Sequence, residues 1–278
     1  MIGTPGPEAT GEDRDLAGYH VMLAAVLYKR AVLIVRYPID TFASLVSMYV
    51  FWALVFFGGR EAAMRMGSSP QALAPTLEGL IVGWFLWTMA SIAYAGLPQN
   101  VTREASWGTL EQLYMSPYGF GSVMASMVVA NVLQSLLWGG GILSMMLLST
   151  GRSLTIDLVT IVPVSFLTLL SVVGVGFLFA GLAIVYKRIG NVSQLMPFVL
   201  VGLVAAPAAG LSPLRFLPLV QGSAMLQETM RHGTRLWQFP ALDLGVLVLT
   251  AIGYFMVGYW TFLRLSRLAR DRGVMGHY

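Results

Sequence analysis

Cysteine is absent from this sequence, and charged residues are scarce. Without cysteine the chain can form no disulfide, no metal site with thiolate ligands and no cysteine nucleophile. Only 11% of the residues are charged, whereas 56% are hydrophobic, and the mean hydropathy is +0.72. A water-soluble domain could not keep so apolar a chain in solution, so the composition predicts an integral membrane protein.

Motifs that carry catalytic or metal chemistry are also missing. Histidine occurs at three scattered positions, and only His232 has a carboxylate one helical turn away, at Glu228. A lone pair of this kind is normally a helix-surface contact, so we expect no metal site. No stretch has the Gly-x-x-x-x-Gly-Lys-Ser/Thr pattern of a P-loop. We therefore expect no cofactor bound by this chain and no enzyme activity of its own.

Long apolar runs dominate the rest of the chain, and each reaches close to the ~20 residues that a bilayer-crossing helix needs. The runs are continuous and rich in Leu, Val, Ala, Met and Gly, unlike the alternating strands of membrane barrels. The fold class is therefore predicted to be an all-α integral membrane protein. Its six predicted spans lie near residues 40–59, 77–99, 119–149, 157–185, 191–212 and 242–263.

Basic residues set the predicted orientation. Most of them lie inside if both termini are cytoplasmic, and the bias is sharpest in "RLSRLARDR", residues 264–272. We expect a multi-pass protein of the cell membrane, with a six-span domain over residues 39–264 and a basic cytoplasmic tail over 265–278. The acidic, Gly- and Pro-rich residues 1–17 are predicted to form a disordered cytoplasmic tail.

The stretch before the first span, "YHVMLAAVLYKRAVLIVRYP", is apolar but is interrupted by Lys29, Arg30 and Arg36. Lys29 and Arg36 are seven residues apart, so they share one face of a helix. This pattern predicts an interfacial helix over residues 18–38, with its basic side facing lipid phosphates. The alternative is a seventh, poor span.

The polar stretch "REASWGTLEQLYMSP", residues 103–117, lies between the second and third predicted spans, on the cytoplasmic side. Its periodicity predicts a short amphipathic helix parallel to the membrane, with Leu110, Leu113 and Tyr114 on one side. The residues expected to face water are Glu104, Thr109, Glu111 and Gln112.

This stretch resembles the Gly-Thr-Leu-Glu motif and Ser-Pro stop found between the second and third spans of type-2 ATP-binding-cassette exporter permeases. The interfacial helix, the six spans, "VYKRIGNVSQLMPF" at 185–198 and the Pro-rich segment before the last span are similar to that family as well. The resemblance implies a coupling helix that docks into a separate ATPase subunit. Its candidate docking residues are Arg103, Glu104, Thr109, Glu111 and Gln112.

The resemblance also implies partners and cargo. A second permease chain, identical or different, would complete the path, and two partner ATPase chains would hold ATP and Mg. The cargo would be a drug, a lipid-linked molecule or a glycan, moved out of the cytoplasm. Membrane lipids are the other expected partner, and no nucleic acid is expected.

Polar residues inside the predicted spans are candidates for lining a path. Asn131 and Gln134 in the third span, and Ser165 and Thr168 in the fourth, are each three residues apart and share a helix face. Such residues could contact a substrate, or they could hold helices together by hydrogen bonds. The sequence leaves both interpretations open.

The positions of the acidic residues bear on the alternative functions. Asp40, Glu78, Asp157 and Asp243 all lie at span ends, so a carrier driven by protons or sodium would lack its usual equipment. An ATPase-independent carrier or channel remains the main alternative, and a membrane scaffold is another. Residues 211–240, with a helix predicted over 223–232, are either a re-entrant segment or an ordinary extracellular loop helix.

Overall fold

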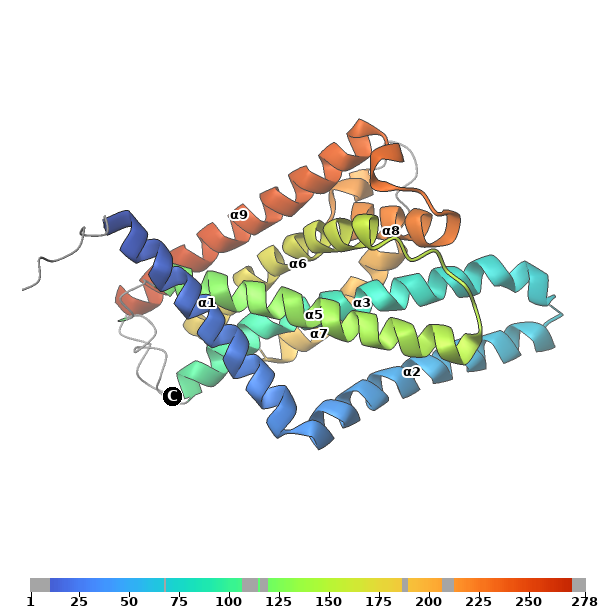
Figure 1. Ribbon diagram of the computed structural model, residues 1–278, viewed down its shortest axis with the longest axis horizontal. Coiled ribbons are helices and arrows are strands. Elements are labelled where there is room, and N and C mark those ends of the chain that lie inside the picture. The colour runs from blue at the N-terminus through green and yellow to red at the C-terminus, as the bar shows by residue number, and fades with distance from the viewer. Residues whose placement is uncertain are drawn as a thin grey trace, which may run out of the picture.

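Helices account for the regular structure of the chain (Figure 1). The computed structural model describes residues 11–67, 69–106, 115, 120–186, 190–206 and 213–271. Over these residues it has eight α-helices, two short 3₁₀ helices and no strand, which confirms the predicted all-α class. The α-helices are α1 (Gly11–Arg36), α2 (Pro38–Arg65), α3 (Pro70–Ser106), α5 (Phe120–Thr150), α6 (Leu158–Tyr186), α7 (Gly190–Ala205), α8 (Val220–His232) and α9 (Ala241–Asp271). The 3₁₀ helices are η1 (Pro213–Phe216) and η2 (Leu236–Gln238).

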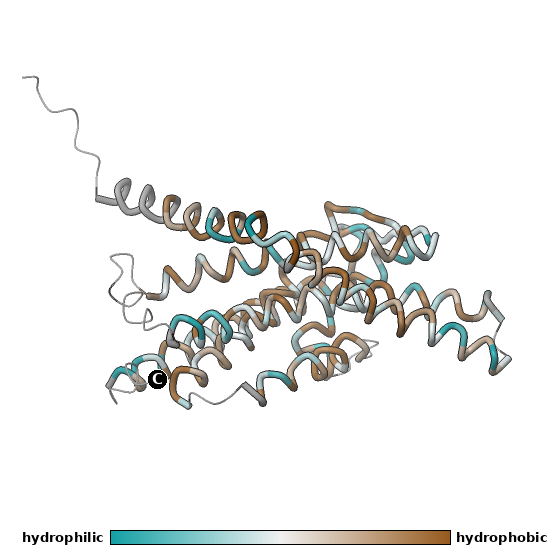
Figure 2. The backbone as a smooth tube through the Cα atoms, turned by 90° about the horizontal axis from the view of Figure 1, so that it is seen from below, coloured by the Kyte–Doolittle hydropathy of each residue, from teal (hydrophilic) through white to brown (hydrophobic). Residues whose placement is uncertain are grey.

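Among the described residues, five helices are long and apolar enough to cross a membrane, as in a multi-pass membrane protein. Hydrophobic residues follow one another along much of their length (Figure 2). These helices coincide with five of the predicted spans and comprise Thr41–Arg65, Gln71–Glu104, Phe120–Thr150, Leu158–Tyr186 and Ala241–Arg270.

The remaining predicted span, residues 191–212, is only partly occupied by a helix. There, α7 has 16 residues and ends at Ala205. At 1.5 Å per residue such a helix covers about 24 Å, less than the ~30 Å of a hydrocarbon core. Residues 207–212 lie outside the described part of the chain.

The contact between α6 and α9 is the closest helix pairing in the bundle, because glycines bring the two backbones together. A Cβ atom on Gly258 would lie 1.9 Å from the carbonyl oxygen of Gly174, and one on Gly174 would lie 2.1 Å from that of Tyr254. Further along, Gly181 lies against Phe262. Residue numbers therefore rise together in both helices, so α6 and α9 run parallel.

The course of α7 follows α3 in the opposite direction. The Trp87 indole N–H on α3 donates a hydrogen bond of 2.8 Å to the Pro197 carbonyl of α7. Near the end of α7, Val204 lies against Gly83. Numbers rise in α7 as they fall in α3, so the two helices are antiparallel. Because α3 continues outward to Pro70, α7 stops well short of the end of the bundle.

Helix α8 begins where α7 ends. The Ser223 hydroxyl donates a hydrogen bond of 2.8 Å to the Val204 carbonyl. A Cβ atom on Gly222 would lie 1.8 Å from Thr168 Oγ1, so the first turn of α8 packs directly on the middle of α6. The start of α8 is therefore inside the bundle.

From that point α8 continues toward the end of the bundle. Gln227 lies beside Gly79 on α3, and the Met230 carbonyl accepts a hydrogen bond of 2.8 Å from the Thr155 amide, just before α6. Helices α7 and α8 thus lie end to end along α3, with a break between them. The helix predicted within residues 211–240 is present, and it packs among α3, α6 and α7 instead of lying on the surface.

Helix α1 lies obliquely across α5, in the half of the molecule that holds the end of α9 (Figure 1). It begins at Gly11, so residues 11–17, which the sequence assigned to a disordered tail, are helical. The chain turns at Tyr37, and Pro38 then opens α2. Proline suits this first helical position because its missing N–H would have no partner there.

The predicted short helix after the second span does not begin at Glu104. Instead α3 continues without interruption to Ser106, so Arg103 and Glu104 belong to the end of the long helix. The rest of the predicted coupling helix falls on residues 107–114, which lie outside the described part of the chain, as do 116–119.

Candidate functional site

A cavity of about 450 Å³ opens between α1, α2, α3 and α5, in the half of the molecule that holds the ends of α3 and α9. We call it the α1 cavity. Its described lining residues combine two arginines with hydroxyl, amide and apolar side chains. They are Arg30, Leu33, Ile34, Tyr37, Thr41, Ser44, Met48, Ile92, Arg103, Gln134 and Trp138.

Arg30 is held in this cavity by two neutral side chains of α5. Its guanidinium donates hydrogen bonds to the side-chain oxygens of Asn131 and Gln134. These two residues share one face of α5, as the sequence predicted, and Asn131 is only 1% exposed. Gly96 leaves the space for Asn131, since a Cβ atom there would lie 2.4 Å from the amide nitrogen. The close contact of α3 and α5 therefore positions the group that holds Arg30.

The electrostatics of the α1 cavity are cationic. Burial lowers the pKa of Arg30, and the positive charge of Arg103 lowers it further. Arg103 also donates a hydrogen bond to the Asn100 side chain one turn earlier in α3. No aspartate or glutamate is among the described residues that line the cavity. An arginine stays charged at neutral pH despite such shifts, so the cavity presents positive charge to whatever enters it.

Of the remaining predicted docking residues, only Glu104 is described, and its predicted exposure is wrong. Its side chain is 8% exposed. The reason is the continuity of α3, in which Leu97, Val101 and Glu104 follow one another at helical spacing on the same buried face. Thr109, Glu111 and Gln112 lie outside the described residues.

The predicted path-lining residues do not form one site. Ser165 and Thr168 lie on α6, and both are buried. The Thr168 hydroxyl donates a hydrogen bond of 2.6 Å to the Val164 carbonyl and packs against Gly222 of α8. Packing between α6 and α8 therefore accounts for Thr168. Asn131 and Gln134, in contrast, meet Arg30 on another side of the bundle.

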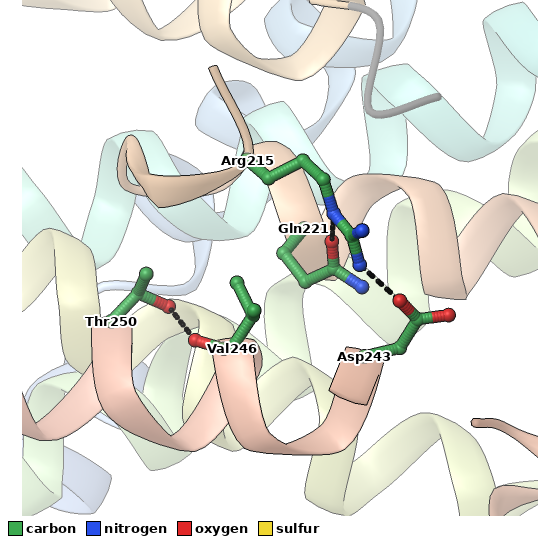
Figure 3. Close-up of polar contacts among 5 residues, drawn as sticks. All are labelled: Arg215, Gln221, Asp243, Val246 and Thr250. Carbon is green, nitrogen blue, oxygen red and sulfur yellow. Dashed lines mark hydrogen bonds and ion pairs between the residues drawn. The ribbon is translucent and has the colours of Figure 1, made fainter. Parts of the chain in front are cut away.

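A second cavity, of about 680 Å³, lies at the opposite end and is built around Arg215 of η1. As Figure 3 shows, Arg215 lies between Gln221 of α8 and Asp243 at the start of α9. Its Nε–H donates a hydrogen bond of 2.9 Å to Gln221, and it forms an ion pair with Asp243. Arg215 is 8% exposed, so its ion pair with Asp243 and its hydrogen bond to Gln221 connect η1 with α9 and α8 inside the protein.

The sequence pointed to neither arginine contact. Arg30 stands out in the sequence only as one of three basic residues in an apolar stretch, and no pattern singles out Arg215. The pair of Glu228 and His232 was predicted, and the ring nitrogen lies 3.0 Å from the carboxylate on the exposed surface of α8. Among the described residues, no three histidine, aspartate or glutamate side chains gather where they could hold a metal ion.

No family model matches the chain, and no curated protein sequence matches it.

Proposed function

We propose that this chain is the transmembrane permease subunit of an ATP-driven exporter of the type-2 ATP-binding-cassette kind. The observation that carries the proposal is that α6 and α9 run parallel, while α7 and α8, which lie end to end, come between them in the sequence. Two parallel helices require the chain to cross back between them, and only α7 and α8 follow α6 before α9. In this proposal, α2, α3, α5, α6, the α7–α8 pair and α9 are the six crossings of a half-transporter.

An even number of crossings leaves the start of α2 and the end of α9 on the same side of the membrane. Arg103 lies at that end of the bundle, together with Arg264, Arg267 and Arg270 of α9. Positive charge favours the cytoplasmic side, which supports cytoplasmic termini and a cytoplasmic segment at residues 103–117. The protein would then be oriented in the cell membrane with its α1 cavity toward the cytoplasm.

The unbroken α3 offers a route from an ATPase to the spans. An ATPase subunit that binds ATP and Mg would move the segment after Ser106, and α3, which contains Pro98 two turns before its end, carries that movement into the bundle. Within the bundle α3 contacts α5, α6, α7 and α8. A second permease chain would supply the other wall of a path for a drug, a lipid-linked molecule or a glycan.

The carboxylates of the described helices favour this function over an ion-driven carrier. Glu78 lies 3.2 Å from Arg152, and Asp243 is paired with Arg215. Asp157 accepts a hydrogen bond of 2.7 Å from Thr160 at the start of α6. Asp157 and Asp243 are thus engaged at helix ends, and Glu78, two turns into α3, is held by Arg152. Ion-driven carriers instead keep such groups deep inside their spans.

Crosslinking tests the docking role directly, because a chain without cysteine accepts a single introduced thiol as its only reactive site. Glu111→Cys places that thiol in the proposed coupling segment, and Arg235→Cys places it at the opposite end as a matched control. In native membranes we expect a thiol-directed crosslinker to join the first variant, and not the second, to an ATPase subunit. Equal crosslinking of both, or none with Glu111→Cys, would overturn the docking role.

A further inference from the structure

We propose that the α1 cavity binds the phosphate headgroup of an anionic membrane lipid. Arg30 is a partly buried cation that donates hydrogen bonds to the neutral side-chain oxygens of Asn131 and Gln134. A charge removed from water is costly unless an opposite charge or strong hydrogen bonds compensate it. An anion in the cavity would supply that compensation.

The cavity has the donors that a phosphate requires. A guanidinium carries more N–H groups than the two bonds to α5 use, and its fork matches phosphate oxygens in pairs. Arg103 lines the same cavity and adds a second positive charge. The hydroxyls of Thr41 and Ser44, at the start of α2, line it as well. A phosphate there would meet two arginines and two hydroxyls.

The walls of the cavity indicate that the anion belongs to a lipid. Leu33 is 44% exposed and Tyr37 is 54% exposed, and both line the cavity where α1 meets α2. Neighbouring apolar side chains on these helices, Val35 and Phe42, are exposed too. In a membrane such a surface faces acyl chains, so the cavity opens toward lipid. A lipid could place its headgroup beside Arg30 while its chains stay in the bilayer.

The matched binding experiment uses the purified full-length chain in a non-ionic detergent. Dioleoyl phosphatidylglycerol, dioleoyl phosphatidylcholine and inorganic phosphate are the probes, and native mass spectrometry counts the lipids retained. We expect phosphatidylglycerol to bind at least about 10-fold more tightly than phosphatidylcholine, since its headgroup carries a net negative charge. Inorganic phosphate at millimolar concentration should displace little of it.

Arg30→Gln should lower the affinity for phosphatidylglycerol about 10-fold, whereas Arg36→Gln should change it less than about twofold. Both changes remove one positive charge from α1, but Arg36 is exposed and does not line the cavity. Ser44→Phe offers a second arm that keeps Arg30 and fills the cavity, with the adjacent exposed Ala43→Phe as its control. This arm decides the matter if Arg30→Gln fails to fold.

Equal binding of the two lipids, or equal losses in Arg30→Gln and Arg36→Gln, would overturn the proposal. Full displacement by inorganic phosphate would assign the site to a soluble phosphate compound, which also contradicts a lipid site. The measurement needs no ATPase subunit, so the lipid site and the proposed exporter function stand or fall separately.

Discussion

The two ends of the bundle hold their arginines in different ways. At the end that contains α8, Arg215 is paired with Asp243, and Arg152 lies 3.2 Å from Glu78. At the end that contains the α1 cavity, Arg30 is held by the amide oxygens of Asn131 and Gln134. A carboxylate neutralises an arginine and fixes it, whereas an amide positions the arginine and leaves its charge in place. The difference separates cations that hold the fold from a cation available to a ligand.

The largest effect on stability is expected for Arg215→Met. This change leaves Asp243 without its cation and Gln221 without its donor at a site where Arg215 is buried. Breaking a buried ion pair from one side should cost about 3 kcal/mol. Unfolding in detergent, followed by tryptophan fluorescence, measures the loss. The double variant Arg215→Met/Asp243→Leu should recover part of it, and a double variant no better than the single one would refute the pairing role.

A smaller loss is expected for Arg152→Gln at the same end. Its pair with Glu78 is more exposed to water than that of Arg215, so the loss should be about 1 kcal/mol. Raising the salt concentration should reduce the difference between the variant and the original chain, because salt screens exposed pairs more than buried ones. A loss as large as that of Arg215→Met would show that the two ion pairs are equivalent.

Gln134→Glu converts the α1 cavity into the kind of site found at the other end. A carboxylate beside Arg30 would neutralise it, so the variant should gain about 1 kcal/mol of stability and bind phosphatidylglycerol about 10-fold more weakly. Gln71→Glu, an exposed residue at the start of α3, makes the same charge change elsewhere and should alter neither quantity. If Gln134→Glu binds phosphatidylglycerol as tightly as the original chain, the positive charge of Arg30 does not contribute to lipid binding.

The smallest effect on stability is expected for Arg30→Gln. Its loss removes hydrogen bonds to neutral partners, so we expect a change within about 1 kcal/mol in the unfolding experiment used for Arg215→Met. A loss near that of Arg215→Met would make Arg30 a structural residue and remove the contrast between the two ends.

The spans that could be predicted are those for which the length of an apolar run is enough to specify a membrane-crossing helix. Long apolar runs placed α2, α3, α5, α6 and α9 correctly, because a bilayer-crossing helix needs such a run and little else. A separate helix after the fifth span was predicted, but the early end of α7 and the position of α8 inside the bundle could not be, since an apolar run looks the same whether its helix continues or ends within the bundle. The positions of α7 and α8 depend on contacts with Gly83 and Thr168, which lie far away in the sequence.

The candidate site was predicted only in part, for a related reason. Periodicity correctly placed Asn131 and Gln134 on one face of α5, because a helix fixes which of its own residues lie together. It carries no information about which other helix meets that face, so Arg30 was missed as their partner. Glu104 was assigned to a new helix, and the prediction failed because α3 extends its buried face to that residue.

The central claim is that this chain works with a separate ATPase, and purification from the native membrane tests it most directly. The full-length chain would be isolated in a gentle detergent and its companions identified by mass spectrometry. The account predicts a P-loop ATPase in a fixed ratio to this chain, together with a second permease chain. Repeated recovery of the folded chain without any ATPase would contradict the account and favour a carrier, a channel or a scaffold.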